Sequence, residues 1–326
     1  MNITDTVSDI PDIPEVPKEI LVAASNGKLV LFIGAGVSRI IGCPSWQDFS
    51  INYLRYVYEN KLINYYEYEN LAKLQPRKLL SICKSILKEK NVRPPDIKNF
   101  FKVDKELKKK YKIFESIYAF NCIYITTNYD DNLDQIAEKS YPKTSTETTI
   151  LSSTIERHEK RYKPIYTNRE DLLVSNLNNG AVIHIHGSVN DEKSMIMTIT
   201  DYMQYYKINS EPTVLLEEIF KSYTVLFVGY GLEEYEILEF MISKSQTAKG
   251  ELKHFMLYPT FRKEINLLKF QIKYYTDLGI QLVPYPIDDN GYEHLATVVD
   301  KWAKQIGPIA KPQCFLDRIK LIDEVI

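Results

Sequence analysis

Residues 28–48 read Lys-Leu-Val-Leu-Phe-Ile-Gly-Ala-Gly-Val-Ser-Arg-Ile-Ile-Gly-Cys-Pro-Ser-Trp-Gln-Asp, and this stretch decides the fold. Its β-branched and aromatic run predicts a strand over 28–33 that ends at Gly34-Ala-Gly36. Ser45 with Asp48 three residues later predicts a capping box at a helix start. A strand, a glycine turn and a helix in this order indicate a nucleotide cradle, although a purely structural turn has the same pattern.

The composition excludes several classes of protein. The chain has 326 residues, 44% of them hydrophobic and 26% charged, with a net charge of −2, so no overall field attracts nucleic acid or an anionic membrane. The basic run 104–112 is typical of a solvated helix face. The sequence has neither a secretory signal nor an apolar stretch of about 18 residues, so it predicts a cytoplasmic protein without membrane or direct nucleic-acid contacts.

The four cysteines do not form any C-x-x-C pair, which argues against a zinc ribbon, and we expect no metal. The 12 glycines are few and are placed selectively. Half of them fall in the motifs described below, where positive φ or close backbone approach requires glycine.

The pattern of strands and helices predicts a Rossmann-like, doubly wound α/β fold with a mostly parallel sheet of about six strands. The expected strands cover 28–33, 122–127, 181–186, 223–228, 252–257 and 280–285. We expect an N-terminal arm and lead-in over 1–25, a catalytic domain over 26–310 and a C-terminal helix, docking element or start of a further region over 311–326. Inside the domain we expect a helical insertion over about 49–118, between the first and second strands, and a second insertion over about 140–180. Further helices are expected at 232–244 and 316–325.

Four of these strands end in a glycine or polar motif. The motifs are Gly34-Ala-Gly36, Asn128-Tyr-Asp130, His186-Gly-Ser188 and Gly229-Tyr-Gly231. Because parallel strands present their carboxyl ends at one edge, this convergence favours a nucleotide site there. Arg39 replaces the third glycine of a dehydrogenase loop, and no G-K-[ST] follows, so a dehydrogenase and an ATPase are disfavoured.

The four motifs resemble the sirtuin signatures in their order. Residues 34–44 are similar to the sirtuin Gly-Ala-Gly-aliphatic-Ser start with its later Gly-x-Pro, and residues 127–130 to Gln-Asn-Ile-Asp. His186-Gly-Ser188 is similar to the sirtuin His-Gly-Ser, and Gly229-Tyr-Gly-Leu232 to Gly-Thr-Ser-Leu. The zinc-binding cysteine pairs of sirtuin deacylases are missing. This absence, with Thr-Thr-Asn-Tyr-Asp and Phe-Val-Gly-Tyr-Gly, resembles the sirtuin-like NADase domains of bacterial anti-phage defence systems.

The resemblance implies an NAD+ glycohydrolase that releases nicotinamide and ADP-ribose and depletes NAD+ as a defence effector. It implies catalytic roles for Asn128 and His186. The NAD+ contacts that we expect are Gly34, Ala35, Gly36, Ser38, Trp46, Thr127, Asp130, Gly229, Tyr230 and Gly231. Implied partners are NAD+ as substrate, further copies of the chain in a homo-oligomer, and a phage trigger protein or a partner defence subunit.

The residue types suit this chemistry. Asn128 is a neutral donor and acceptor that can hold a water or a ribose hydroxyl, and His186, with a pKa near neutrality, can accept a proton. The amides of Ala35 and Gly36 are expected to face the pyrophosphate, and Gly229 and Gly231 to let backbone approach a ribose or phosphate. The resemblance assigns Asp130 to the nicotinamide carboxamide.

Alternatives stay open from sequence. Asn128, Asp130 and Asp131 also suit a helix cap, and Trp46 suits either a helix staple or a lid over the ribose. His184 shares a strand face with His186 by alternation, and we expect it to be a satisfied core or supporting histidine. The rival functions are an NAD-dependent protein deacylase, a non-catalytic sensor of NAD+ or ADP-ribose, and a structural scaffold.

Overall fold

The computed structural model describes residues 10–140, 145–151, 154–160, 164–207, 209–231 and 254–311, with the backbone alone in the second and third of these ranges. Its strands form a seven-stranded sheet in which all the pairs are parallel. In spatial order they are β5 (Ile165–Tyr166), β6 (Val182–His184), β2 (Ile123–Thr126), β1 (Leu29–Ile33), β7 (Thr224–Val228), β8 (His254–Thr260) and β9 (Ile280–Pro286). The predicted Rossmann-like α/β class is confirmed, and the two-residue β5 is the strand that the sequence pattern misses.

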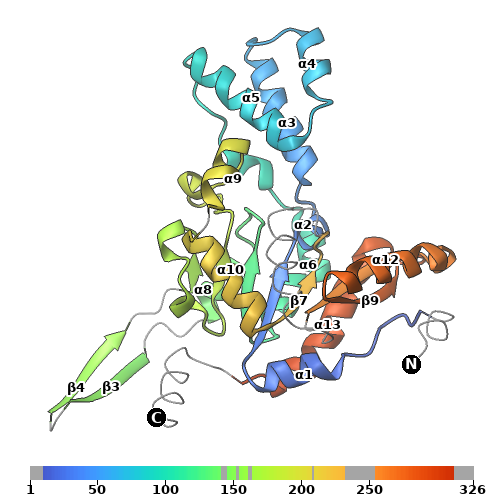
Figure 1. Cartoon of the computed structure of the whole chain (residues 1–326). Coiled ribbons are helices and arrows are strands. Elements are labelled where there is room, and N and C mark those ends of the chain that lie inside the picture. The colour runs from blue at the N-terminus through green and yellow to red at the C-terminus, as the bar shows by residue number, and fades with distance from the viewer. Residues whose placement is uncertain are drawn as a thin grey trace.

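Helices cover both faces of this sheet (Figure 1). The described helices are α1 (Lys18–Ser25), α2 (Ala35–Arg39), α3 (Trp46–Glu59), α4 (Tyr65–Leu71), α5 (Pro76–Glu89), α6 (Lys105–Tyr111), α7 (Ile113–Tyr118), α8 (Asp134–Ser140), α9 (Ile199–Tyr205), α10 (Glu211–Ser222), α12 (Ile265–Asp277) and α13 (His294–Ile306). Helices α1, α7 and α13 pack on the face that carries Leu31 and Leu226, and α10 and α12 pack on the face that carries Val30 and Phe227. The near-continuous apolar strands are buried on both sides, as a parallel sheet requires.

A third apolar cluster lies outside these two layers. Helices α3 and α5 contribute Phe49, Leu54 and Leu80 to it, and they stand with α4 at one end of the molecule (Figure 1). The same cluster contains Tyr129 and Met195, which belong to the segments that follow β2 and β6. The helices between β1 and β2 therefore pack directly beside two of the sequence motifs.

The described part of the predicted N-terminal arm lies on its own domain. Trp302 of α13 donates from Nε1 to the Pro14 carbonyl at 2.8 Å, and His294 Nε2 lies 2.7 Å from the Asp12 carbonyl. The predicted helices at 232–244 and 316–325 and the start of the predicted strand 252–257 fall outside the described residues. No helix in the part of the chain that is described combines the length and apolar character that a membrane crossing requires.

The segment after β1 has an extra element. Ser45 and Asp48 form the predicted capping box of α3, with the Asp48 amide donating to Ser45 Oγ at 3.1 Å. Before it, Gly34 opens the short helix α2, which the sequence pattern does not predict.

A separate antiparallel pair, β3 (Ser145–Leu151) and β4 (Thr154–Lys160), forms part of the predicted second insertion.

The glycine turn is pressed against the end of β7. The Gly36 amide donates to the Gly229 carbonyl at 2.8 Å. A Cβ added at Gly34 would lie 2.4 Å from that same carbonyl oxygen, and one added at Gly229, whose φ is +60°, would lie 2.6 Å from the Val37 nitrogen. These glycines are therefore required by the approach of one backbone to another.

We predict that Gly34→Ala lowers the free energy of unfolding by about 1–3 kcal/mol, because the added methyl meets rigid backbone. Urea denaturation measures the loss. Ala35→Ser is the matched control, because the Ala35 side chain is exposed between the two glycines, and its midpoint should stay that of the wild type. Equal midpoints for Gly34→Ala and the wild type would show that the turn and Gly229 are not in contact.

Candidate active site

The strand register aligns the four motifs in one row. Ile33 pairs with Thr126 and with Val228, and Thr126 pairs with His184. The residues that follow these positions therefore sit side by side at the carboxyl edge, in the order His186, Asn128, Gly34 and Gly229. This edge is where open α/β sheets bind their ligands.

Asn128 is held with its amide in one orientation. Its Nδ2 donates to the Gly34 carbonyl and to Ser38 Oγ, both at 3.0 Å. The Gly34 carbonyl is only an acceptor, so the nitrogen rather than the oxygen must face it. Both amide hydrogens are thus used by the protein, and the Oδ1 atom of this half-buried side chain is the part that can accept a hydrogen bond from a ligand.

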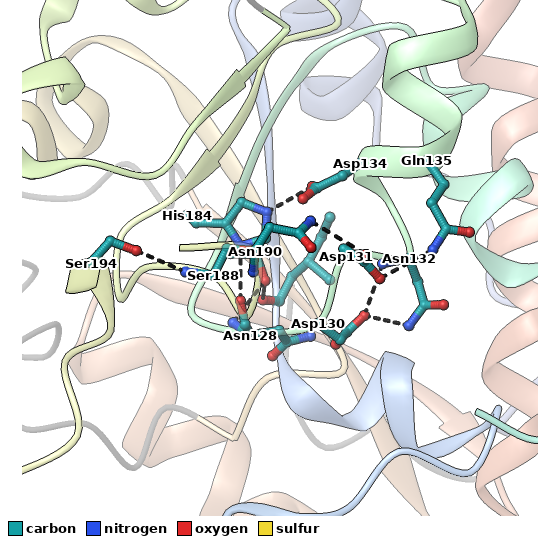
Figure 2. Close-up of polar contacts among 12 residues, drawn as sticks. Asn128, Asp130, Asp131, Asn132, Asp134, Gln135, His184, Ser188, Asn190 and Ser194 are labelled. Atoms are coloured by element: carbon teal, nitrogen blue, oxygen red, sulfur yellow. Dashed lines mark hydrogen bonds and ion pairs between the residues drawn. The ribbon is translucent and has the colours of Figure 1, made fainter. Parts of the chain in front are cut away.

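A chain of hydrogen bonds continues from Asn128 into the domain. Ser38 Oγ donates to Asp130 Oδ2 at 2.6 Å, and Asn132 donates from Nδ2 to Asp130 Oδ1 at 2.6 Å. Lys108 of α6 donates to Asn132 Oδ1 at 2.8 Å. Figure 2 shows Asn128, Asp130 and Asn132 beside one another in the loop between β2 and α8. Asp130 is 6% exposed and accepts a hydrogen bond on each of its two carboxylate oxygens.

His184 supports the same loop from the other side. Its Nδ1 lies 2.9 Å from the Asn128 carbonyl, and its Nε2 lies 2.7 Å from Asp134 Oδ1 (Figure 2). Both partners are acceptors, so an imidazolium paired with a carboxylate satisfies all four atoms. Burial by itself lowers the pKa of His184, but the Asp134 charge and hydrogen bond, aided by the Asn128 carbonyl, outweigh it and the pKa is raised.

His186 lies in a different environment from His184. Its Nε2 is 2.6 Å from the Tyr206 hydroxyl, and its Nδ1 is 3.3 Å from the Tyr202 hydroxyl. The imidazole is 1% exposed. Burial, with a smaller contribution from the Arg77 charge, lowers the pKa of His186 from 6.5 to about 3. The imidazole is therefore neutral at physiological pH, and the expected pKa near neutrality is wrong for this conformation.

The two histidines do not share a face, contrary to the alternation rule. β6 ends at His184, and the chain turns so that the Gly187 amide bonds the His184 carbonyl at 3.3 Å. His184 contacts α8, whereas His186 lies against the tyrosines of the α9 segment. Alternation holds only while the strand continues, and here it stops two residues before His186.

Several expected ligand contacts are occupied by protein. The Gly36 amide bonds Gly229, so in this structure it is not available to a pyrophosphate, and Gly229 approaches backbone instead of a ribose. The Ser38 hydroxyl bridges Asn128 and Asp130. The Ala35 position is exposed at the first turn of α2. Ser38 and Asp130 therefore act on Asn128 from within the fold.

The remaining predicted contacts surround this row. Trp46 stacks on Phe49 and lies 5.6 Å from the Tyr129 ring, which places it in the α3–α5 cluster. Tyr230 packs edge-on against Phe32 at 5.0 Å, and the Gly231 carbonyl accepts from Tyr275. Thr127 is half-buried directly before Asn128.

Asp131 lies beside the row of four motifs, and it contacts α8 and Lys98. Its carbonyl accepts from the Gln135 amide at 3.2 Å at the start of α8, and its carboxylate lies 3.5 Å from the Lys98 ammonium.

Sequence reasoning missed the residues that surround the motifs. Asp134, Asn132 and Lys108 fix the Asn128 loop, and Tyr202 and Tyr206 fix His186. The run Asp-Asp-Asn-Leu-Asp at 130–134 was visible as a polar cluster, but nothing in it distinguished the residue that meets His184. Tyr202 and Tyr206 had the spacing of one helix face, which is equally typical of core packing.

Several side chains of the carboxyl edge are packed inside the fold. Ser38, Asp130 and His186 are all buried. Two surface hollows lie elsewhere, one of about 720 Å³ between α7 and α13 and one of about 470 Å³ beside α9. Among the described residues no cluster of histidine, cysteine or carboxylate side chains is arranged to hold a metal, and the described cysteines are buried and separate.

The buried His186 predicts an acid-sensitive fold. Its folded pKa lies below its unfolded value of 6.5, so its stabilising effect is complete above that pH and is lost as the pH falls toward 3. The unfolding free energy should fall by about 1.4 kcal/mol for each pH unit below the unfolded pKa on account of this residue. His186→Gln should remove this slope in urea titrations between about pH 7.5 and about pH 5. Equal slopes in the variant and the wild type would show that His186 is solvated.

We predict that Asp134→Asn lowers the unfolding free energy at neutral pH by about 3–5 kcal/mol, because it leaves a buried imidazolium without its partner. Asp131→Asn is the control, since the Asp131 ion pair is partly exposed and should be worth about 1 kcal/mol or less. Urea denaturation compares the two variants. Similar losses in both would contradict a charged His184–Asp134 pair.

Comparison with known proteins agrees with the geometry. Residues 123–281 match the family described as SIR2-like domain, a range that includes Asn128, His186 and Gly229. Defense-associated sirtuin 2 of Bacillus subtilis is 24% identical over 293 residues, which cover 87% of this chain and 26% of that protein. The chain thus spans about a quarter of the length of this relative. We conclude that residues 123–281 match a SIR2-like domain and that the chain is similar to a defence-associated sirtuin, in line with the resemblance that its motifs predict.

Proposed function

We propose that this chain is an NAD+ glycohydrolase, which cleaves the bond between nicotinamide and ribose and depletes NAD+ in defence against phage. The observation that carries the proposal is the fixed amide of Asn128, whose Oδ1 alone is left for a ligand at the carboxyl edge. The SIR2-like domain supports NAD+ as the substrate, and the name of the defence-associated relative supports the role in defence.

An amide oxygen suits hydrolysis of this bond. The nicotinamide–ribose bond breaks through a cationic, oxocarbenium-like transition state. A water molecule must then be held where it can attack the ribose carbon that loses nicotinamide. Asn128 Oδ1 can accept a hydrogen bond from that water or from a ribose hydroxyl, and it is too weak a nucleophile to trap the cation. The side chain is locked by Gly34 and Ser38, so the geometry is set before the substrate arrives.

The charges around Asn128 suit a developing cation. Asp130 is buried two residues away, and its carboxylate accepts hydrogen bonds from Ser38 and Asn132. The buried His184–Asp134 pair carries compensating charges, and Lys108 reaches the same network through Asn132. The Asp130 carboxylate is linked to Asn128 through the Ser38 hydroxyl, and a carboxylate held in a dry site favours a transition state that carries positive charge.

The proposal extends to the assembly. We expect a homo-oligomer and control by a phage trigger protein or a partner defence subunit. An NAD-dependent deacylase is the alternative from the same family, and it is disfavoured because the sequence has no C-x-x-C pair for the zinc module.

We predict that the purified protein releases nicotinamide from NAD+ without an acetyl-lysine peptide. Asn128→Ala should lower this release by about 10²-fold or more, because the water or hydroxyl loses its acceptor. Asn190→Ala is the matched control, since Asn190 is an exposed asparagine in the loop after His186 and should leave the rate unchanged. Chromatography of the products measures nicotinamide and ADP-ribose together.

Other outcomes would contradict the proposal. Release that depends on the peptide identifies a deacylase. NAD+ binding by calorimetry with no release, also in the presence of candidate triggers, identifies a sensor. Equal rates for Asn128→Ala and Asn190→Ala would remove Asn128 from the reaction.

A further inference from the structure

Helix α12 packs on the sheet with one face and exposes the other. Leu268 and Tyr275 are buried in the apolar cluster on that side of the sheet, and Ile265 and Ile272 pack against it. These positions are spaced by three and four residues, which places their side chains on one face of the helix. The opposite face is therefore turned away from the domain, and α12 lies at the side of the molecule (Figure 1).

The outward face of α12 is apolar at its centre. Leu267, Phe270 and Tyr274 are 52%, 71% and 51% exposed. Their spacing of three and four residues places them in one stripe along the helix. A single exposed apolar side chain needs no explanation, but several in one stripe mark a surface that another protein covers.

Opposite charges stand at the two ends of this stripe. Lys263 belongs to the turn η5 (Arg262–Glu264) directly before α12, and Asp277 is the last residue of the helix. Both residues are exposed, and within the described part of the chain neither charge has an ion-pair partner. The two charges and the three apolar residues have the spacing of a coiled-coil seam, alternately four and three, at positions 263, 267, 270, 274 and 277.

The stripe is complementary to itself in one direction only. When two copies pack antiparallel about a two-fold axis at Phe270, each Lys263 faces Asp277 of the other copy. Leu267 of each copy then lies opposite Tyr274 of the other, and the two Phe270 rings meet at the axis. Parallel packing would instead place lysine against lysine and aspartate against aspartate, which is repulsive.

We propose that the outward face of α12 is an interface between two copies of this chain, packed antiparallel about Phe270. The inference rests on the proposed function only for its expectation of a homo-oligomer, and it names the surface through which the copies associate. The apolar side chains supply the attraction because they leave water on association. The two Lys263–Asp277 pairs fix the direction and the register of the helices.

Sedimentation velocity of the purified chain, at a series of micromolar concentrations, tests the interface. The wild type should sediment as a dimer or as an assembly of dimers. Phe270→Glu should raise the dissociation constant by about 10²-fold or more, because it places a charge from each copy at the centre of the apolar contact. Val22→Glu is the matched control, since Val22 is a 58% exposed apolar residue of α1, and it should associate like the wild type.

Charge reversal tests the antiparallel direction. Lys263→Glu brings two carboxylates together at both ends of the interface and should raise the dissociation constant by about tenfold. The double variant Lys263→Glu with Asp277→Lys restores opposite charges and should return the constant to the wild-type value. Lys269→Glu is the control, because Lys269 is an exposed lysine of α12 outside the stripe, and it should leave the constant unchanged.

Three results would overturn the proposal. Equal association of Phe270→Glu and the wild type shows that the copies meet through another surface. A double charge variant as weak as Lys263→Glu rules out the antiparallel pairing. A wild type that stays monomeric at every concentration rules out the interface, and a lower urea midpoint for Phe270→Glu than for Val22→Glu would then show that the chain covers the stripe itself.

Association and nicotinamide release are separate measurements, so the two proposals fail separately. A chain that releases nicotinamide but does not associate through α12 contradicts the interface alone. A chain that associates as expected but releases no nicotinamide contradicts the glycohydrolase alone.

Discussion

The hydrogen bond from the Gly36 amide to the Gly229 carbonyl is the contact on which the carboxyl edge depends. It brings the turn after β1 against the end of β7 at a separation that excludes any Cβ at Gly34. That position directs the Gly34 carbonyl and the Ser38 hydroxyl toward Asn128 on the neighbouring strand. The glycines are therefore required by the close packing of the two backbone segments. That packing in turn sets the positions of the groups that bind Asn128.

Asn128 is the point at which the polar network of the edge converges. Gly34 and Ser38 bind its amide, Ser38 connects it to Asp130, and His184 binds its carbonyl. Such a network is stabilising only when every polar group in it has a hydrogen-bond partner, because a buried group cannot bond to water instead. Its rigidity suits a reaction in which orientation of one water or hydroxyl matters more than a strong base, and the neutral His186 fits the same description.

The parts of the fold that could be predicted were those with local signals. The strand over 28–33, the Ser45 capping box and the four strand-end motifs follow from periodicity and turn chemistry, and the parallel sheet follows from the alternation of strands and helices along the chain. Partners across the fold could not be predicted. Asp134 lies 50 residues from His184 and Tyr206 lies 20 from His186, and their pairing depends on where α8 and α9 pack. The near-neutral pKa expected of His186 was wrong for the same reason, since burial beneath α9 is a tertiary effect.

A crystal structure of the protein with ADP-ribose tests the central claim most directly. The account predicts that the ligand lies along the carboxyl edge, with a ribose hydroxyl or its bound water within hydrogen-bond distance of Asn128 Oδ1. It also predicts that the Asn128 amide keeps its bonds to Gly34 and Ser38. A ligand in the hollow between α7 and α13, or an Asn128 amide turned away from Gly34, would contradict it.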